Sequence, residues 1–160
     1  MVLRSLLLAA VMSAVLIAPA AHAQQEPVSA NVPGWRFTSE FERSGYVNCR
    51  AITGSGGLGA IVAQRNNGEA YLSISAQGLR GRFPNSRIIS NGVTWPVMAE
   101  ANGDRLWFTG ISANGVERIM ANGFYEFILS NGQRNSVDLT NRGSAAWAVV
   151  RRCVRSALGN

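Results

Sequence analysis

Residues 88–108 read IISNGVTWPVMAEANGDRLWF and contain two Asn-Gly pairs, each flanked by alternating apolar residues. Asn-Gly favours a two-residue hairpin loop, because both central residues of a type I′ turn need φ > 0. A loop at Asn102-Gly103 sets Ala99 opposite Leu106 on an apolar face, and a loop at Asn91-Gly92 continues that face. The stretch therefore predicts two consecutive antiparallel hairpins that share one buried side.

Two further Asn-Gly pairs predict hairpins of the same kind. A loop at Asn67-Gly68 brings Ala63 opposite Leu72, again on one apolar face. At Asn131-Gly132 a strict two-residue loop mixes the faces, whereas a three-residue loop with a left-handed glycine keeps the apolar residues together. We therefore expect four hairpins along the chain.

The remaining two Asn-Gly pairs predict the ends of a short helix. Asn114 stands three residues before a glutamate, as in a capping box, and Asn122-Gly123 supplies a left-handed stop. A helix over residues 116–121 follows. Asp104 is the only aspartate in the whole series, which excludes a calcium-binding repeat that needs aspartates at fixed offsets.

The rest of the chain predicts a mainly β (α+β) fold. Apolar residues alternate from Trp35 to Phe41 and from Val47 to Ala51, as in strands, and residues 145–158 carry an apolar stripe at helical spacing. The pattern fits an antiparallel sheet of seven or eight strands, sandwich-like or a partly closed barrel, with one C-terminal helix.

The N-terminal sequence predicts export and a single domain. Residues 1–23 have a positive start, an apolar run and an Ala-His-Ala ending, which is typical of a secretory signal peptide. Residues 24–34 are rich in turn formers and predict a flexible lead-in, and residues 35–160 form one β-rich domain. No later stretch is long and apolar enough to predict a transmembrane segment. We expect a periplasmic or secreted bacterial protein.

Cys49 and Cys153 are the two cysteines of the chain. In an exported protein such a pair predicts a disulfide rather than reactive thiols. The bond would tie the C-terminal helix to an early strand.

The charged composition excludes several kinds of chemistry. The full chain has a formal charge of +6, and loss of Arg4 with the signal peptide would leave +5, carried entirely by arginine. His22, the only histidine, would be lost as well. Nucleophilic catalysis that needs a histidine or lysine base, and histidine metal sites, are therefore not expected, and no cofactor is expected.

The run GSGGLG at residues 54–59 matches a dinucleotide-binding pattern, but a hairpin follows it where a helix is required. We interpret it as a connecting loop. Ser55 within it is a candidate nucleophile, but the expected mature chain has no histidine or lysine to serve as its base. Carboxylates leave an alternative, because the preferred register at Asn131-Gly132 sets Glu126 opposite Asp138 on the outward face. Two surface acids neutralised by neighbouring arginines are the competing interpretation.

Residues 79–87, LRGRFPNSR, are the candidate binding loop. Arg80, Arg82 and Arg87 surround Phe83, an arrangement that suits an anionic envelope component, such as lipopolysaccharide or an acidic glycan, or an extracellular protein. The competing interpretation is a solvated loop. A nucleic-acid partner is not expected for an exported chain of this modest charge.

The chain contains, in this order, Trp35, Cys49, strands separated by Asn-Gly turns, and the closing stretch SVDLTNRGSAAWAVVRRC. In this order it resembles small exported bacterial proteins of the invasion-associated locus B type and their uncharacterised relatives. That family closes with a Leu-x-Gly-x-x-x-Ala helix, which Leu139, Gly143 and residues 146–148 approximate, and its additional cysteine pairs are absent here. The resemblance implies a noncatalytic envelope or secreted protein.

The sequence thus favours a noncatalytic binding or interaction module of unknown ligand. A carboxylate-dependent hydrolase and an inhibitor of a secreted protease are the alternatives. The oligomeric state does not follow from the sequence.

Overall fold

The computed structural model describes residues 25–54, 59–139 and 142–159. The expected signal peptide, residues 1–23, and Ser55 with most of the glycine-rich run lie outside the described residues. The elements are β1 (Gln25–Pro27), β2 (Trp35–Phe41), β3 (Val47–Thr53), β4 (Ile61–Arg65), β5 (Ala70–Ser75), β6 (Gly81–Ser90), β7 (Val93–Asn102), β8 (Arg105–Ile111), α1 (Ala113–Asn122), β9 (Phe124–Ile128), β10 (Arg134–Asp138) and α2 (Gly143–Ala157).

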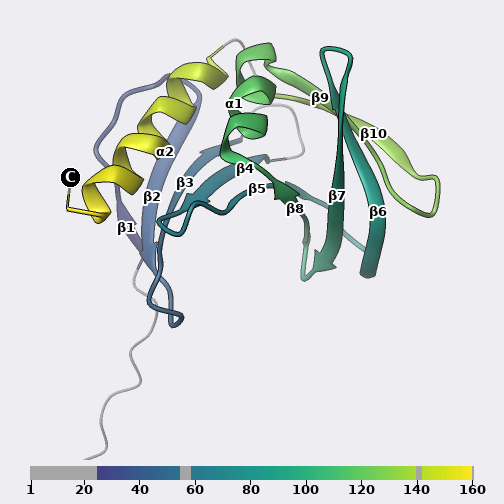
Figure 1. Ribbon diagram of the computed structural model, residues 1–160, viewed down its shortest axis with the longest axis horizontal. Coiled ribbons are helices and arrows are strands. Elements are labelled where there is room, and N and C mark those ends of the chain that lie inside the picture. Colours follow the sequence, from purple (N-terminus) through teal and green to yellow (C-terminus); the bar gives the residue numbers. More distant parts are fainter. Residues whose placement is uncertain (1–24, 55–58, 140–141, 160) are drawn as a thin grey trace, which may run out of the picture.

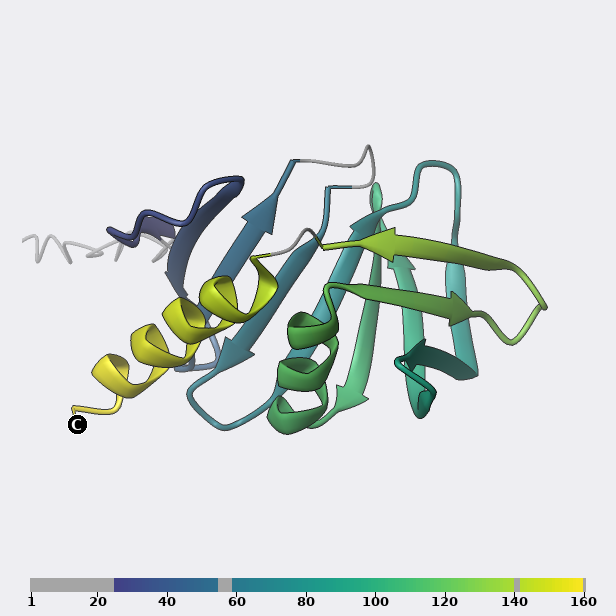
Figure 2. The ribbon, with the colours of Figure 1, turned by 90° about the horizontal axis from the view of Figure 1, so that it is seen from above.

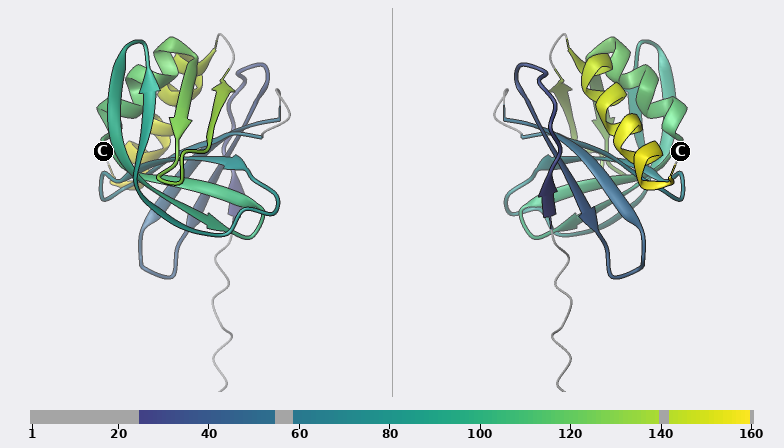
Figure 3. Two further views of the ribbon diagram at one scale, coloured as in Figure 1. Left: turned by 90° about the vertical axis from the view of Figure 1, so that its right-hand side faces the viewer. Right: turned by 90° about the vertical axis from the view of Figure 1, so that its left-hand side faces the viewer.

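All strands belong to one antiparallel sheet with the order β1-β2-β3-β4-β5-β8-β7-β6-β9-β10. Both helices lie over the same face of this sheet (Figure 1). Helix α2 packs on β2, β3 and β4, while α1 packs between α2, β5 and β9 (Figure 2). The sheet curves around the two helices, as the end-on views show (Figure 3). We call the face that carries the helices the inner face and the opposite one the outer face.

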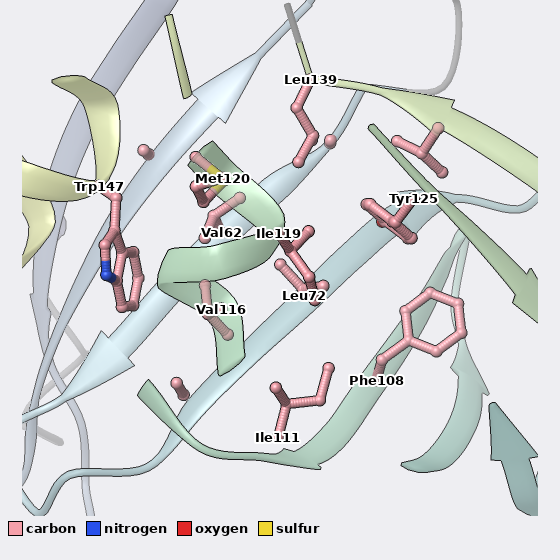
Figure 4. Packing of buried hydrophobic residues seen from close by; sticks show 14 of the residues in the cluster. Val62, Leu72, Phe108, Ile111, Val116, Ile119, Met120, Tyr125, Leu139 and Trp147 are labelled. Carbon is pink, nitrogen blue, oxygen red and sulfur yellow. The ribbon is translucent and has the colours of Figure 1, made fainter. Parts of the chain in front are cut away.

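The core fills the space between the inner face and the helices (Figure 4). Phe108 is one of its aromatic residues, and the ring centroids of Phe127 and Tyr125 lie 5.2 Å and 6.5 Å from that of Phe108. The largest fully buried side chains come from both helices, from strands β4, β5, β6, β8 and β9, and from the residues that follow β9 and β10: Trp147, Tyr125, Phe108, Leu72, Ile74, Ile88, Leu106, Ile119, Met120, Leu129, Leu139 and Val62.

The predicted mainly β class, with an antiparallel sheet and a C-terminal helix, is confirmed. The described strands form a single sheet that does not close, and their number is corrected. The described residues form ten strands rather than seven or eight, and β1 and β10 are the two edges of the sheet. One additional strand arises in the expected lead-in, where residues 25–27 pair with β2. Residues 79–87, expected as a loop, instead lengthen the strand that was predicted before Asn91-Gly92, because Gly81–Ser90 pairs along β7. A bulge between Phe83 and Ser86 accommodates Pro84 there, and Asn85 has φ 59°.

The loop at Asn91-Gly92 is as predicted. Both residues have positive φ, and Ile88 pairs with Trp95. At the second hairpin the loop shifts by one position to Gly103-Asp104, because Asn102 still pairs with Arg105. The predicted register is therefore wrong by two residues, so Ala99 pairs with Phe108. A slip of two residues keeps the apolar set on the inner face, which is why the predicted face was correct.

The loops at Asn67 and Asn131 are both three residues long, for the same local reason. The Oδ1 atom of each asparagine accepts a hydrogen bond, at 3.0 Å, from the backbone N–H two residues later. This geometry shifts the β4–β5 register by one residue, so Val62 rather than Ala63 lies opposite Leu72 on the inner face. The predicted pairing there was wrong.

The helix boundaries also differ from expectation. Helix α1 begins three residues earlier than predicted, because Ser112 is its N-cap and accepts a hydrogen bond from the Gly115 N–H at 3.1 Å. Asn114 lies inside the helix instead of capping it. The predicted left-handed stop is confirmed at Gly123, with φ 72°.

The predicted disulfide is confirmed between Cys49 of β3 and Cys153 of α2, whose Cα atoms lie 6.0 Å apart. Cys49 points to the inner face and is fully buried. Since side chains alternate along a strand, its neighbours Asn48 and Arg50 point to the outer face.

Candidate functional site

The outer face has a cleft over the middle of the sheet, which we call the outer-face cleft. It encloses about 320 Å³ and lies over β3, β4, β5, β8 and β7. Its lining residues are Glu42, Asn48, Arg50, Arg65, Tyr71, Glu100, Asn102, Trp107 and Thr109. The volume lies at the lower end of the range for small-ligand pockets, about 300 to 1,000 Å³.

Sheet register brings these side chains together from distant parts of the sequence. Asn48 of β3 pairs with Arg65 of β4. Arg50 of β3 pairs with Ala63 of β4, which pairs on its other side with Tyr71 of β5. Because residues that are paired across strands point to the same side, the side chains form a continuous row on the outer face. The row continues through Trp107 of β8, which pairs with Ser73 and with Glu100.

Asn48 forms the floor of the cleft and has no exposed surface. Its Nδ2 atom donates to Glu42 Oε1 at 2.9 Å and to the Tyr71 hydroxyl. A carboxylate oxygen can only accept, so the amide nitrogen must be on that side and the carbonyl oxygen on the other. That oxygen, Oδ1, is buried and has no hydrogen-bond partner in the described part of the chain.

Arg50 adds a second buried atom of this kind. One terminal nitrogen of its guanidinium forms an ion pair with Glu40 of the neighbouring strand β2. Its Nε atom is buried without a hydrogen-bond partner among the described residues. A buried polar group without a partner costs about 1–3 kcal/mol, so such atoms are uncommon unless a water or a ligand completes them.

Glu42 organises the charged wall of the cleft. Its Oε1 atom accepts from Arg65 Nε at 3.0 Å as well as from Asn48, and Ser44 donates to Oε2 at 3.2 Å. Arg65 also binds Glu69 at 2.8 Å. Burial tends to lower the pKa of Arg65, but the bonds to Glu69 and Glu42 outweigh it and raise that pKa. The Arg65 hydrogen bond in turn lowers the pKa of Glu69.

Two aromatic rings form the other wall. The ring centroids of Tyr71 and Trp107 lie 5.6 Å apart, and the ring planes are tilted by 60°. The Arg65 guanidinium lies 5.7 Å from the Tyr71 centroid, and that of Arg105 lies 5.9 Å from Trp107. Such contacts stabilise the orientation of both rings.

Arg105 anchors Trp107 from below the cleft rim. Its Nε donates to Ser73 at 2.8 Å and its Nη2 to the Gly59 carbonyl oxygen at 2.6 Å. Partial burial lowers the pKa of Arg105, though an arginine stays protonated under ordinary conditions.

The predicted binding residues do not converge on one point. Arg82 and Arg87 pair with Glu100 and Pro96 of β7, four residues apart, which separates them by roughly 13 Å along the strand. Phe83 is half-buried against the core, and Arg80 is exposed. None of the four lines the outer-face cleft, but the Arg82 Nε lies 3.3 Å from Glu100, which does.

The alternative catalytic pair is not opposed in the way the sequence suggested. Glu126 pairs with Ser136 and Asp138 with Phe124, a register two residues away from the predicted one. Asp138 lines a separate hollow beside the end of α1 and the start of α2, and Glu126 does not line it. The two carboxylates therefore lie diagonally rather than directly across the hairpin.

No group of metal-binding side chains occurs within residues 25–54, 59–139 and 142–159. Over the same ranges no helix is long and apolar enough to cross a membrane. No protein-family model matches the chain, and neither the curated proteins nor the solved structures gave a match.

Proposed function

We propose that the protein is a noncatalytic binding module of the bacterial periplasm or exterior, and that the outer-face cleft is its ligand site. The observation that carries this proposal is the floor of the cleft, where the fully buried Asn48 leaves its carbonyl oxygen without a partner. Most buried polar groups are satisfied within the protein, so an unpartnered one on a residue that lines a cleft supports a ligand site.

The chemistry of the lining favours binding over catalysis. Both Oε1 interactions of Glu42 hold it to neighbouring side chains, and the Glu100 carboxylate contacts Arg82. Carboxylates fixed in this way orient their donors rather than transfer protons to a substrate. The rigid strand positions of Asn48 and Arg50 suit recognition of a defined ligand.

Export is supported by two independent features. The pattern of residues 1–23 is typical of a signal peptide, and the Cys49–Cys153 bond is of the kind that persists in oxidising compartments. The resemblance to the invasion-associated locus B type of protein is in keeping with this proposal. Three alternatives stay predictions. They are a hydrolase that uses Glu126 and Asp138, an inhibitor of a secreted protease, and an anionic partner bound by Arg80, Arg82 and Arg87.

An NMR screen of the isotope-labelled mature domain tests the proposal. Mixtures of neutral sugars, sugar acids, inorganic phosphate and short peptides are added, and the Trp107 indole resonance, assigned with Trp107→Phe, is followed. At least one mixture should shift this resonance together with backbone amides of β3 and β5. Shifts confined to the surface around Arg80 and Arg87, with the cleft unchanged, would refute the placement of the site.

A further inference from the structure

Two residues that line the outer-face cleft, Asn48 and Arg50, each have a buried atom without a partner among the described residues, and these two atoms have opposite hydrogen-bonding character. Asn48 Oδ1 accepts and Arg50 Nε donates, and both atoms are buried. The two residues are separated by one position on β3, so their Cα atoms lie about 6.6 Å apart on the same face of the sheet. A ligand that completes both must offer a donor and an acceptor within a short span.

This requirement discriminates between classes of ligand. A carboxylate or phosphate has acceptors for Arg50 but brings another acceptor toward Asn48 Oδ1, where a donor is needed. A hydroxyl group both donates and accepts, and neighbouring hydroxyls on a sugar ring present both functions side by side. The pair of free atoms therefore favours a polyhydroxylated ligand over an anion.

The charges around the cleft point in the same direction. The lining contains two arginines and two glutamates. Each is already in an ion pair: Arg50 with Glu40, Arg65 with Glu42, and Glu100 with Arg82. An ionic ligand would have to compete with these internal pairs, whereas an uncharged one would leave them intact.

The aromatic wall supplies an apolar surface next to the two polar atoms. The Tyr71 hydroxyl accepts from Asn48, and the Tyr71 ring contacts that of Trp107, which is only half-buried. The C–H face of a pyranose ring is apolar and packs on an aromatic ring, while its edge carries the hydroxyl groups. The volume of about 320 Å³ has room for a mono- or disaccharide.

We infer that the outer-face cleft binds a neutral saccharide, whose ring packs on Trp107 and whose hydroxyls meet Asn48 Oδ1 and Arg50 Nε. This inference rests on the proposed function, because it assigns a ligand class to the same site. A short extended peptide has donors and acceptors too and is the competing occupant.

The test is a titration of the isotope-labelled mature domain with single probes of each class. Maltose, cellobiose and N-acetylglucosamine are the neutral sugars, glucuronate and inorganic phosphate are the anions, and trialanine is the peptide. At least one neutral sugar should shift the Trp107 indole resonance saturably. The affinity of that sugar for the domain should change less than about twofold between about 0.05 M and about 0.5 M salt, because no net charge is neutralised on binding.

Two variants fix the location. Trp107→Ala should weaken sugar binding by at least about tenfold. Met98→Ala is the matched control, because Met98 lies on the same face and is 41% exposed but does not line the cleft. Met98→Ala should leave the affinity within about twofold of the wild type. Circular dichroism and the melting temperature verify that both variants are folded.

The outcomes separate the two proposals. A cleft that responds to glucuronate, phosphate or trialanine, but to no neutral sugar, overturns the saccharide inference and leaves the binding site in place. A cleft that responds to no probe overturns both. Equal loss of sugar binding in Trp107→Ala and Met98→Ala places the sugar elsewhere on the outer face and also overturns the inference.

Discussion

Gly143 of α2 lies directly against the backbone of Met120 in α1, so that a Cβ atom at position 143 would stand 2.3 Å from the Met120 carbonyl oxygen. No side chain fits at that distance without a movement of one helix. The absence of a side chain at this position thus determines how closely the two helices approach each other.

We expect Gly143→Ala to destabilise the domain by about 1–3 kcal/mol, because the added methyl group overpacks a contact with backbone rather than with a flexible side chain. Gly54→Ala is the matched control, since a Cβ there meets nothing within 4 Å. Urea unfolding of both variants measures the difference. Equal stability of the two variants would show that the helices separate at little cost.

The start of α1 gives a second prediction. Ser112→Ala removes the side-chain oxygen that accepts from the Gly115 N–H and should cost about 1 kcal/mol of stability. Asn114→Ala, at the position that the sequence suggested as the cap, should change stability by less than about 0.5 kcal/mol, because Asn114 is exposed inside the helix. The reverse order in thermal unfolding would contradict the observed cap.

Two buried tyrosines should respond in opposite ways to loss of the hydroxyl group. The Tyr125 hydroxyl is buried without a hydrogen-bond partner among the described residues, whereas the Tyr71 hydroxyl accepts from Asn48. Tyr125→Phe should therefore be neutral or stabilising at pH 7, and Tyr71→Phe should cost about 1 kcal/mol. Equilibrium unfolding of both variants makes the comparison.

Tyr125 also predicts a pH dependence. Burial raises the pKa of Tyr125 above its ordinary value of 10.0. The unfolded chain then loses this proton first as the pH rises, so its contribution to stability is fully present below about pH 10 and decreases above it. Tyr125→Phe should flatten this alkaline decrease in the free energy of unfolding. An unchanged slope between about pH 9 and pH 11 would contradict the burial of an ionisable group there.

The disulfide gives the fifth prediction. Cys49 and Cys153 are separated by 104 residues, and the chain-entropy model assigns a bond across such a loop about 4–5 kcal/mol. The double variant Cys49→Ser with Cys153→Ser should lose a stability of this order, and reduction of the wild type should produce the same loss. A loss below about 1 kcal/mol in guanidinium unfolding would mean that packing alone holds α2 in place.

The period of two in the sequence predicted the inner face of β7 and β8 correctly, but on β4 it placed Ala63 where Val62 lies, because the loop length was not predicted. Asn91 and Asn67 both precede a glycine, yet Asn91 enters a two-residue turn with φ 46°, while the Asn67 side chain bonds to the Glu69 N–H and lengthens its loop. The two outcomes differ in one side-chain hydrogen bond. The one-residue register error between β4 and β5 follows directly from it.

The candidate site was missed because it is non-local. Asn48 and Arg50 alternate with Cys49, a pattern that is equally typical of a solvated strand face. Tyr71 and Trp107 come beside them only through the strand order, in which β8 pairs with β5. The sequence held one usable signal, namely polar residues on the second face of a strand whose first face forms the disulfide.

Strand β3 is fixed on one side by a covalent bond and faces the outer-face cleft on the other. Cys49 ties its backbone to α2, while the adjacent residues present their polar atoms to the opposite side. In the binding site that we propose, these polar atoms are preorganised, so that binding removes little chain entropy. The binding free energy of such a site comes from its contacts with the ligand and is not reduced by the entropy cost of ordering the protein. A small ligand can therefore be bound selectively.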